Sequence, residues 1–246
     1  MTMSLAAEIN PPRQSFLQWV SSHGFVIFLL VYGLWVFTPF FAPLFMQIGW
    51  THAGKAIYFI YSFFCHQLPE RSFFLFGEKT MYSLMEIQAA WQDTANPMLL
   101  RQFIGNATMG WKIAWSDRMI SVYTSIWLFA LLWFPMRYRT KPIVLWGFML
   151  LLIPILVDGG THAISDLSGI GNGFRDTNMW LAALTNDSLP TSFYAGDALG
   201  SFNSTMRFVT GVLAGLGISW LLFPYLFQTR FQDEQADSVN YAKVIN

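Results

Sequence analysis

The chain has 246 residues and a formal net charge of zero; 54% of its residues are hydrophobic and only 11% are charged. A charged share about half that of a soluble domain, together with several long apolar runs, is typical of an integral membrane protein. The balanced charge gives no basis for nucleic-acid binding, and one cysteine excludes a disulfide within the chain.

The chain is predicted to begin with a polar and interfacial lead, residues 1–24, followed by an apolar run at about 25–48. The lead lacks the basic start and short apolar core of a signal peptide, so we expect this run to be a retained membrane span. Pro39 and Pro43 should kink the span or end it early.

A shorter helix is predicted at 52–67, and its apolar stretch, 56–65, has only ten residues. Ten residues are too few to cross the bilayer unless Lys55 snorkels toward the headgroups. The number of spans therefore stays open between four and five.

Three clearer spans follow, and together with the earlier segments they make residues 25–227 an all-α, polytopic transmembrane helical bundle. These three spans are predicted at about 118–134, 143–157 and 206–227. The span predicted at 143–157 should end at Val157, because Asp158-Gly159-Gly160 follows it.

Charge asymmetry predicts how the bundle is oriented. The turn after residue 134 carries Arg137, Arg139 and Lys141 without an acid, whereas the 158–205 connection carries five acids and one cation. By the positive-inside rule that turn is cytoplasmic, and so is the tail, 228–246. The two long loops, 67–117 and 158–205, are then extracytoplasmic, in the plasma or inner membrane of a cell.

The last span carries a small-residue face. Arg207, Gly211, Gly215 and Ser219 recur every four residues and share one side of the helix. Gly211-x-x-x-Gly215 is a pattern that allows close helix packing in lipid, so Arg207 is predicted to point into the bundle. The alternative is an arginine that snorkels from a helix end.

Polar residues from several segments should meet at one membrane face. Asp158 at a helix C-terminus is disfavoured by the helix dipole and needs a cation, for which Arg118 and Arg207 are candidates. The alternative is that Arg118 and Arg207 are interfacial anchors at helix ends and that Asp158 is a solvated loop carboxylate. The candidate polar pocket consists of Cys65, His66, Arg71, Arg118, Asp158, His162, Arg175 and Arg207.

A divalent metal is the one cofactor that the spacing suggests. Asp158, His162 and Asp166 would align if their segment were helical, and His66 or Cys65 could join them in a zinc-like site. Gly159-Gly160 argues against a regular helix there, and Cys65 alone is most often an inert, packed thiol.

Several short motifs resemble an uncharacterised prokaryotic membrane protein family, domain of unknown function number 2085. The resemblance rests, in matching order, on Cys65-His66-Gln67 with Arg71-Ser72-Phe73, Asp117-Arg118 with Tyr123, Asp158-Gly159-Gly160-Thr161, Phe174-Arg175-Asp176-Thr177-Asn178, and Arg207 with Thr210-Gly211. This chain has Ser116 and Met119 where the family has cysteines, and His162 where it has glutamine. The resemblance implies a multi-span membrane protein and brings no established activity.

Two functions follow as hypotheses. The first is a non-enzymatic accessory or structural subunit of a membrane assembly, because long Trp- and Phe-rich loops offer partner surfaces and complete catalytic signatures are absent. The second is a membrane enzyme or binder of an anionic lipid or isoprenoid phosphate. Arg71, Arg118, Arg175 and Arg207 would hold the phosphate, and Asp158 with His66 or His162 would do proton or metal work.

Overall fold

The computed structural model describes residues 19, 20 and 23–228, so nearly all of the expected lead and tail lies outside the described residues. Four helices in this part of the chain are long and apolar enough to cross a membrane, and they confirm the predicted all-α membrane fold. They run from Gly24 to Gln47, Asp117 to Met136, Leu145 to Asp166 and Phe202 to Phe227.

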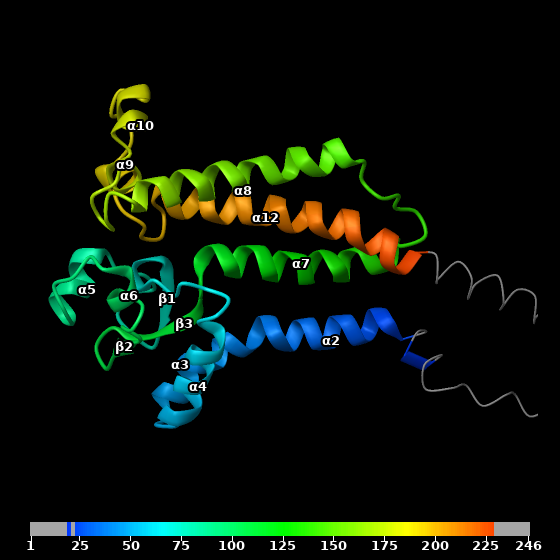
Figure 1. The fold of residues 1–246 in the computed structure, drawn as a ribbon, viewed down its shortest axis with the longest axis horizontal. Coiled ribbons are helices and arrows are strands. Elements are labelled where there is room, and N and C mark those ends of the chain that lie inside the picture. The colour runs from blue at the N-terminus through cyan, green and yellow to red at the C-terminus, as the bar shows by residue number, and fades with distance from the viewer. Residues whose placement is uncertain (1–18, 21–22, 229–246) are drawn as a thin grey trace, which may run out of the picture.

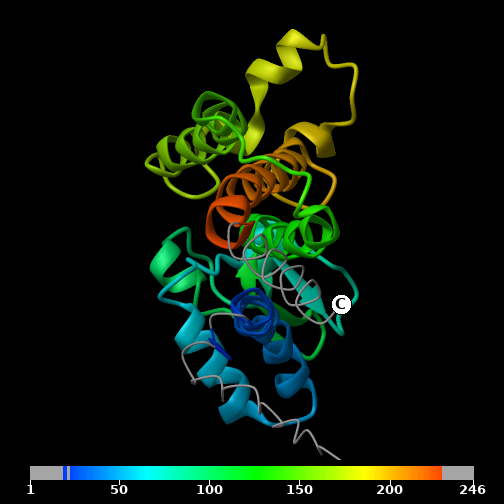
Figure 2. The ribbon, with the colours of Figure 1, turned by 90° about the vertical axis from the view of Figure 1, so that its right-hand side faces the viewer.

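The four helices lie side by side in the order α2 (Gly24–Phe37), α7 (Asp117–Met136), α12 (Phe202–Phe223) and α8 (Leu145–Asp166) (Figures 1 and 2). Helix α12 therefore packs against both α7 and α8 along its length, whereas α2 packs mainly against α7 and meets α12 only near its end, at Phe223. The π-helical turn η3 (Pro224–Gln228) continues α12.

The first span changes its helical geometry at its prolines. Helix α2 passes into the 3-10 turn η1 (Thr38–Phe40) and then into α3 (Phe41–Gln47), which lies beside α4 (Thr51–Tyr61) (Figure 1). Helix α4 has 11 residues and spans about 16 Å at 1.5 Å per residue, well short of the bilayer core. It ends at Tyr61, and Gln67 adopts a left-handed backbone conformation with φ of 54°.

A small antiparallel sheet, which the sequence patterns did not indicate, joins the first loop to the bundle. Its strand order is β1 (Ser72–Leu75), β3 (Gly110–Ser116) and β2 (Gly105–Asn106). Ser72 pairs with Ser116, and β3 runs directly into α7. This pairing brings the 3-10 turn η2 (Pro69–Arg71) beside the first residues of α7.

The remaining elements are short helices in the two long loops. Helix α5 (Leu84–Ala90) begins at a capping box formed by Ser83 and Glu86. The others are α6 (Pro97–Leu100), α9 (Phe174–Thr177), α10 (Met179–Leu184) and α11 (Thr191–Tyr194).

Glycines let α12 approach α7 closely. A Cβ atom on Gly211 would lie 2.0 Å from the Ser121 Oγ, and one on Gly215 would lie 1.9 Å from the Ser125 Oγ. The Ser219 hydroxyl donates to the Ile126 carbonyl at 3.4 Å. The small-residue face of the last span therefore lies against α7.

The expectation that a span ends at Val157 is wrong, because α8 continues through Gly159-Gly160 to Asp166. Glycine in a helix costs about 1 kcal/mol relative to alanine. At Gly159 the missing side chain makes room, since a Cβ there would lie 3.1 Å from the Arg118 Nη1. The ion pairs of Asp158, described below, tie this last part of the helix to its neighbours.

Candidate functional site

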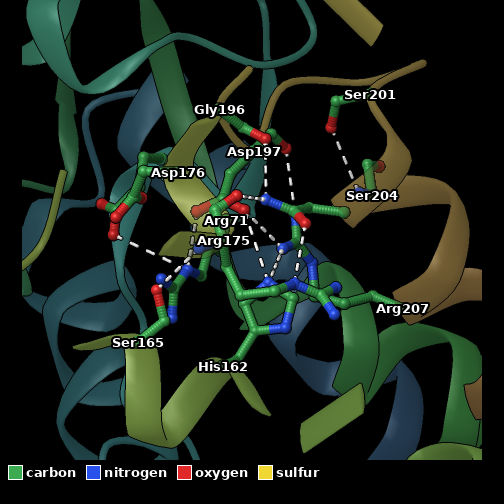
Figure 3. A network of polar contacts seen from close by, with 12 residues as sticks. Arg71, His162, Ser165, Arg175, Asp176, Gly196, Asp197, Ser201, Ser204 and Arg207 are labelled. Carbon is green, nitrogen blue, oxygen red and sulfur yellow. Dashed lines mark hydrogen bonds and ion pairs between the residues drawn. The ribbon is translucent and has the colours of Figure 1, made fainter. Parts of the chain in front are cut away.

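The starts of α7 and α12 and the end of α8 lie together next to the sheet (Figure 1). Charged side chains gather there, and Figure 3 shows several of them. Arg71 reaches this place from η2, Arg175 from α9 and Asp197 from the loop before α12. We refer to the following residues as the charged network: Arg71, Asp117, Arg118, Asp158, His162, Asp166, Arg175, Asp197 and Arg207.

Arg71 joins the first long loop to the second. Its Nη1 and Nη2 donate to the two carboxylate oxygens of Asp166, both at 2.7 Å, and its Nε donates to Asp197 Oδ2 at 2.9 Å. Paired N–H donors in a fixed fork match a carboxylate in both geometry and charge. Arg71 therefore holds the end of α8 and the loop before α12 against η2.

Arg207 is 2% exposed, and each of its guanidinium nitrogens donates to an oxygen of Asp117 or Asp197. Its Nε donates to Asp117 Oδ1 and Oδ2 at 2.9 and 2.7 Å, and its Nη1 donates to Asp197 Oδ1 at 2.6 Å. Its Nη2 donates to the Asp197 carbonyl at 2.9 Å. These contacts tie α12 to the start of α7, and a guanidinium buried in this way does not snorkel.

Asp197 bridges the two arginines, Arg71 and Arg207. Burial alone would raise the pKa of this carboxyl, but the guanidinium groups of Arg207 and Arg71 hold it well below its usual range. Asp197 is therefore an anion across the physiological pH range.

Asp158 is shared by the other two arginines. Arg118 Nη2 donates to Asp158 Oδ2 at 2.7 Å, and Arg175 Nη2 donates to Asp158 Oδ1 at 2.8 Å. Arg175 also donates to the Thr161 hydroxyl at 3.1 Å and to the Asn203 side chain at 3.2 Å. Asp158 thus has the cation partner expected for it, and it lies about two turns before the end of a longer helix.

The charges of the network balance in total but not locally. Arg71 and Arg207 donate hydrogen bonds to three carboxylates, those of Asp117, Asp166 and Asp197. By contrast, Arg118 and Arg175 share the single carboxylate of Asp158. The excess positive charge therefore lies on the Arg118 and Arg175 side.

His162 lies between the two halves of the network and is almost fully buried. Its Nδ1 is 3.0 Å from the Asp158 carbonyl, and its Nε2 is 3.3 Å from Arg207 Nη1. A neutral ring with its proton on Nδ1 satisfies both contacts, because Nδ1 then donates to the carbonyl and Nε2 accepts from the guanidinium.

The other two members of the predicted pocket, Cys65 and His66, lie beside the network. The buried Cys65 Sγ accepts from the backbone N–H groups of Gln67 and Ser116, both at 3.4 Å. His66 is exposed. These contacts fit the packed-thiol interpretation of the lone cysteine.

The structure does not bring His66, Asp158, His162 and Asp166 into one metal-binding group. Among the described residues, no three His, Cys, Asp or Glu side chains converge as metal ligands. The helical spacing from Asp158 to Asp166 is present, but guanidinium groups occupy the oxygens of both carboxylates.

Sequence reasoning missed Asp117 and Asp197 as members of the site. Asp117 could have been suspected, because it precedes Arg118 at the start of a span. Asp197 is one of five acids in a long loop, and no local pattern separates it from the other four.

Glu70 and Lys112 form a second buried polar feature beside the network. Neither Glu70 oxygen accepts a hydrogen bond from the described residues, whereas Lys112 Nζ donates to the carbonyls of Gln67 and Arg101 at 2.6 and 2.8 Å. Burial raises the pKa of Glu70 to about 7, against the opposing effect of Arg71. Burial lowers the pKa of Lys112 to about 7, against the opposing effect of Glu70.

Two cavities adjoin the network. The larger, which we call the groove, has a volume of about 870 Å³ and lies between α8, the α9–α10 segment and α12. Apolar residues dominate its wall, and Asp158, Thr161, Arg175 and Thr177 supply its polar part. The smaller, which we call the chamber, has a volume of about 330 Å³, and Arg71, Arg118 and Arg207 are among the residues that line it.

Four apolar helices of spanning length, with a charged network at one end, define a polytopic integral membrane protein. Residues 106–221 match the family described as "Predicted membrane protein (DUF2085)", which confirms the resemblance found in the sequence motifs. The "Uncharacterized protein MJ1492" of Methanocaldococcus jannaschii is 24% identical over 212 residues, covering 83% of this chain and 93% of the relative. No solved structure matches the chain.

Proposed function

We propose that this protein binds one amphipathic lipid with an anionic headgroup in the groove. The observation that carries the proposal is the groove's lining, in which apolar residues of α8 and α12, such as Val157 and Met206, adjoin Arg175 and Thr161. Lipid-binding cavities need an apolar wall for the acyl chain and a few polar groups for the headgroup. Arg175 belongs to the half of the network with excess positive charge, which favours an anion.

The contacts of Arg71 and Arg207 support a structural role for most of the charged network. All three guanidinium nitrogens of Arg71, and Nε and Nη1 of Arg207, already donate to carboxylates, and Arg207 Nη2 donates to the Asp197 carbonyl, so a phosphate would have to displace a buried anion. Breaking a buried ion pair costs about 3–5 kcal/mol. An open clamp of four arginines around one phosphate is therefore disfavoured, and these two ion-pair sets instead hold the helix ends together.

Lipid extraction from the purified full chain tests the proposal. We expect mass spectrometry to find about one anionic lipid per protein, and Val157→Trp to lower that amount at least tenfold by filling the groove. Leu156→Trp is the matched control, because Leu156 is an exposed neighbour outside the groove lining. Equal lipid retention by the two variants, both folded, would contradict the proposal.

An accessory-subunit role is a second candidate, and one observation favours it. Met179, Leu184 and Leu199 expose large apolar side chains in the loop beyond the helix ends, with Leu184 76% exposed. Exposed apolar patches of this kind mark partner or membrane contacts. Cross-linking from position 184 in native membranes should capture a stoichiometric partner chain, and cross-links to lipid alone would argue against a protein partner.

We further propose that the α7–α8 turn is cytoplasmic and that the charged network lies at the extracytoplasmic face, in the plasma membrane of the cell. The positive charge of Arg137, Arg139 and Lys141 supports this orientation. In a Cys65→Ser background, the Leu189→Cys variant should react with an impermeant thiol reagent in intact cells, and the Arg139→Cys variant should react only after lysis. The reverse pattern would invert the orientation.

A further inference from the structure

Arg118 is the least satisfied guanidinium of the charged network. Its Nη2 donates to Asp158 at 2.7 Å and lies 3.5 Å from His162 Nδ1. Its Nε is buried and has no partner among the described residues. An unpaired buried donor costs about 1–3 kcal/mol, so this nitrogen provides a reason for an acceptor to bind nearby.

The chamber beside Arg118 has the features of an anion site. Its lining includes Arg71 and Arg207 as well as Arg118, and the two carboxylates that line it, Asp117 and Asp166, are each held by one of those arginines. The least compensated charge in its wall is that of Arg118, whose one carboxylate partner among the described residues, Asp158, is shared with Arg175.

The start of α7 adds to the positive potential of the chamber. Helix α7 has 20 residues, its N-cap residue Ser116 makes no side-chain capping hydrogen bond, and Ser116 and Met119 both line the chamber. Backbone N–H groups at a helix N-terminus attract anions, and here one of them, the Arg118 N–H, already donates to Asp117 Oδ1 at 2.7 Å, which leaves the others for a ligand. The Ser116 hydroxyl is available as a further donor.

We propose that the chamber binds a phosphate-like oxyanion, with Arg118 as its main ligand. The oxyanion accepts from the Arg118 guanidinium and from the start of α7, while Arg71 and Arg207 keep their carboxylate partners. The volume of about 330 Å³ leaves room for an organic substituent, so both inorganic phosphate and the phosphate of a lipid headgroup have the required chemistry. This site is separate from the groove and does not depend on the lipid proposed there.

Binding of ³²P-labelled inorganic phosphate to the detergent-purified full chain tests the site. We expect saturable binding, a loss of at least tenfold in affinity for Arg118→Gln, and partial retention for Arg118→Lys. Met119→Trp, which fills the chamber without changing a charge, should lose binding as well. Arg139→Gln, at an exposed cation in the α7–α8 turn, should bind like the unchanged protein.

Vesicles containing phosphatidic acid identify the source of the oxyanion. Displacement of the labelled phosphate by these vesicles from the Val157→Trp protein, whose groove is filled, assigns the site to a lipid headgroup, and an unaffected signal assigns it to free phosphate. The proposal is overturned if neither phosphate nor phosphatidic acid binds, or if Arg118→Gln and Met119→Trp bind as tightly as the unchanged chain. Val157→Trp should leave phosphate binding intact, so failure at the groove and failure at the chamber are distinguishable.

Discussion

At the scale of single residues, Glu70 and Lys112 make stability depend on pH. Glu70 is 2% exposed and its carboxylate accepts no hydrogen bond from the described residues, so ionisation in the folded state has little compensation. Its pKa is about 7 in the fold, above the usual value near 4.5, so the folded state holds the proton more tightly than the unfolded state does. Stability from this group is therefore fully present below about pH 4.5 and is lost as the pH rises to 7.

Glu70→Gln should remove that loss, because glutamine is neutral at every pH. At pH 8 we expect the variant to be more stable than the unchanged protein by about 3 kcal/mol, and at pH 4.5 to be about equal to it. A thiol-reactive dye can report unfolding, since Cys65 is the single cysteine and is buried. Glu78→Gln, at an exposed acid, serves as the control. A constant difference between Glu70→Gln and the unchanged protein across this pH range would contradict the assignment.

Lys112 acts in the opposite direction above pH 7. Its pKa is lowered to about 7, so above that pH the unfolded state binds the proton that the folded state has released. The contribution of Lys112 to stability therefore rises between about pH 7 and 10.5. Together, Glu70 and Lys112 give the stability of the fold a minimum near neutral pH.

At the scale of elements, α7 and α12 form the closest helix pair in the bundle. Serine hydroxyls of α7 occupy the space that side chains on Gly211 and Gly215 would need. In lipid, helix association depends on close packing and interhelical hydrogen bonds rather than on water exclusion. The separation of these two helices also sets the reach of Arg207 to Asp117, so packing and the charged network depend on each other.

Gly215→Ala should destabilise the protein by about 2 kcal/mol through overpacking against Ser125. Ser125→Gly should cost less in the Gly215→Ala background than alone, because it removes the clashing atoms, and a double-mutant cycle of thermal unfolding measures this coupling. Gly160→Ala is the matched control, since a Cβ there meets nothing within 4 Å. Equal effects of the two glycine substitutions would show that the contact with α7 is not responsible.

At the scale of the whole molecule, the sequence indicates the membrane spans better than the loops. Twenty apolar residues signal a span without reference to the rest of the chain. The sheet has no comparable signal, because its strands have two to seven residues and the fully buried Lys112 interrupts the apolar pattern of β3.

The charged network, too, could be predicted from the sequence only in part. The four-residue spacing of Arg207 with two glycines indicates its buried side from local sequence alone. Its partner Asp197 and the contact of Arg71 with Asp166 depend on how the loops fold over the helix ends, which no local pattern specifies. The continuation of α8 past its glycine pair was missed for a related reason, since the compensating ion pairs of Asp158 come from α7 and α9.

The shared carboxylate of Asp158 has a thermodynamic consequence, which rests on both binding proposals. Arg118 adjoins the chamber and Arg175 adjoins the groove, and one anion divides its attraction between them. An oxyanion that draws Arg118 away leaves Asp158 to neutralise Arg175 more fully, which weakens the lipid site. By linkage, lipid must weaken the oxyanion site by the same factor. Lipid retention measured with and without saturating phosphate should fall in phosphate, and unchanged retention would show that the two cavities act independently.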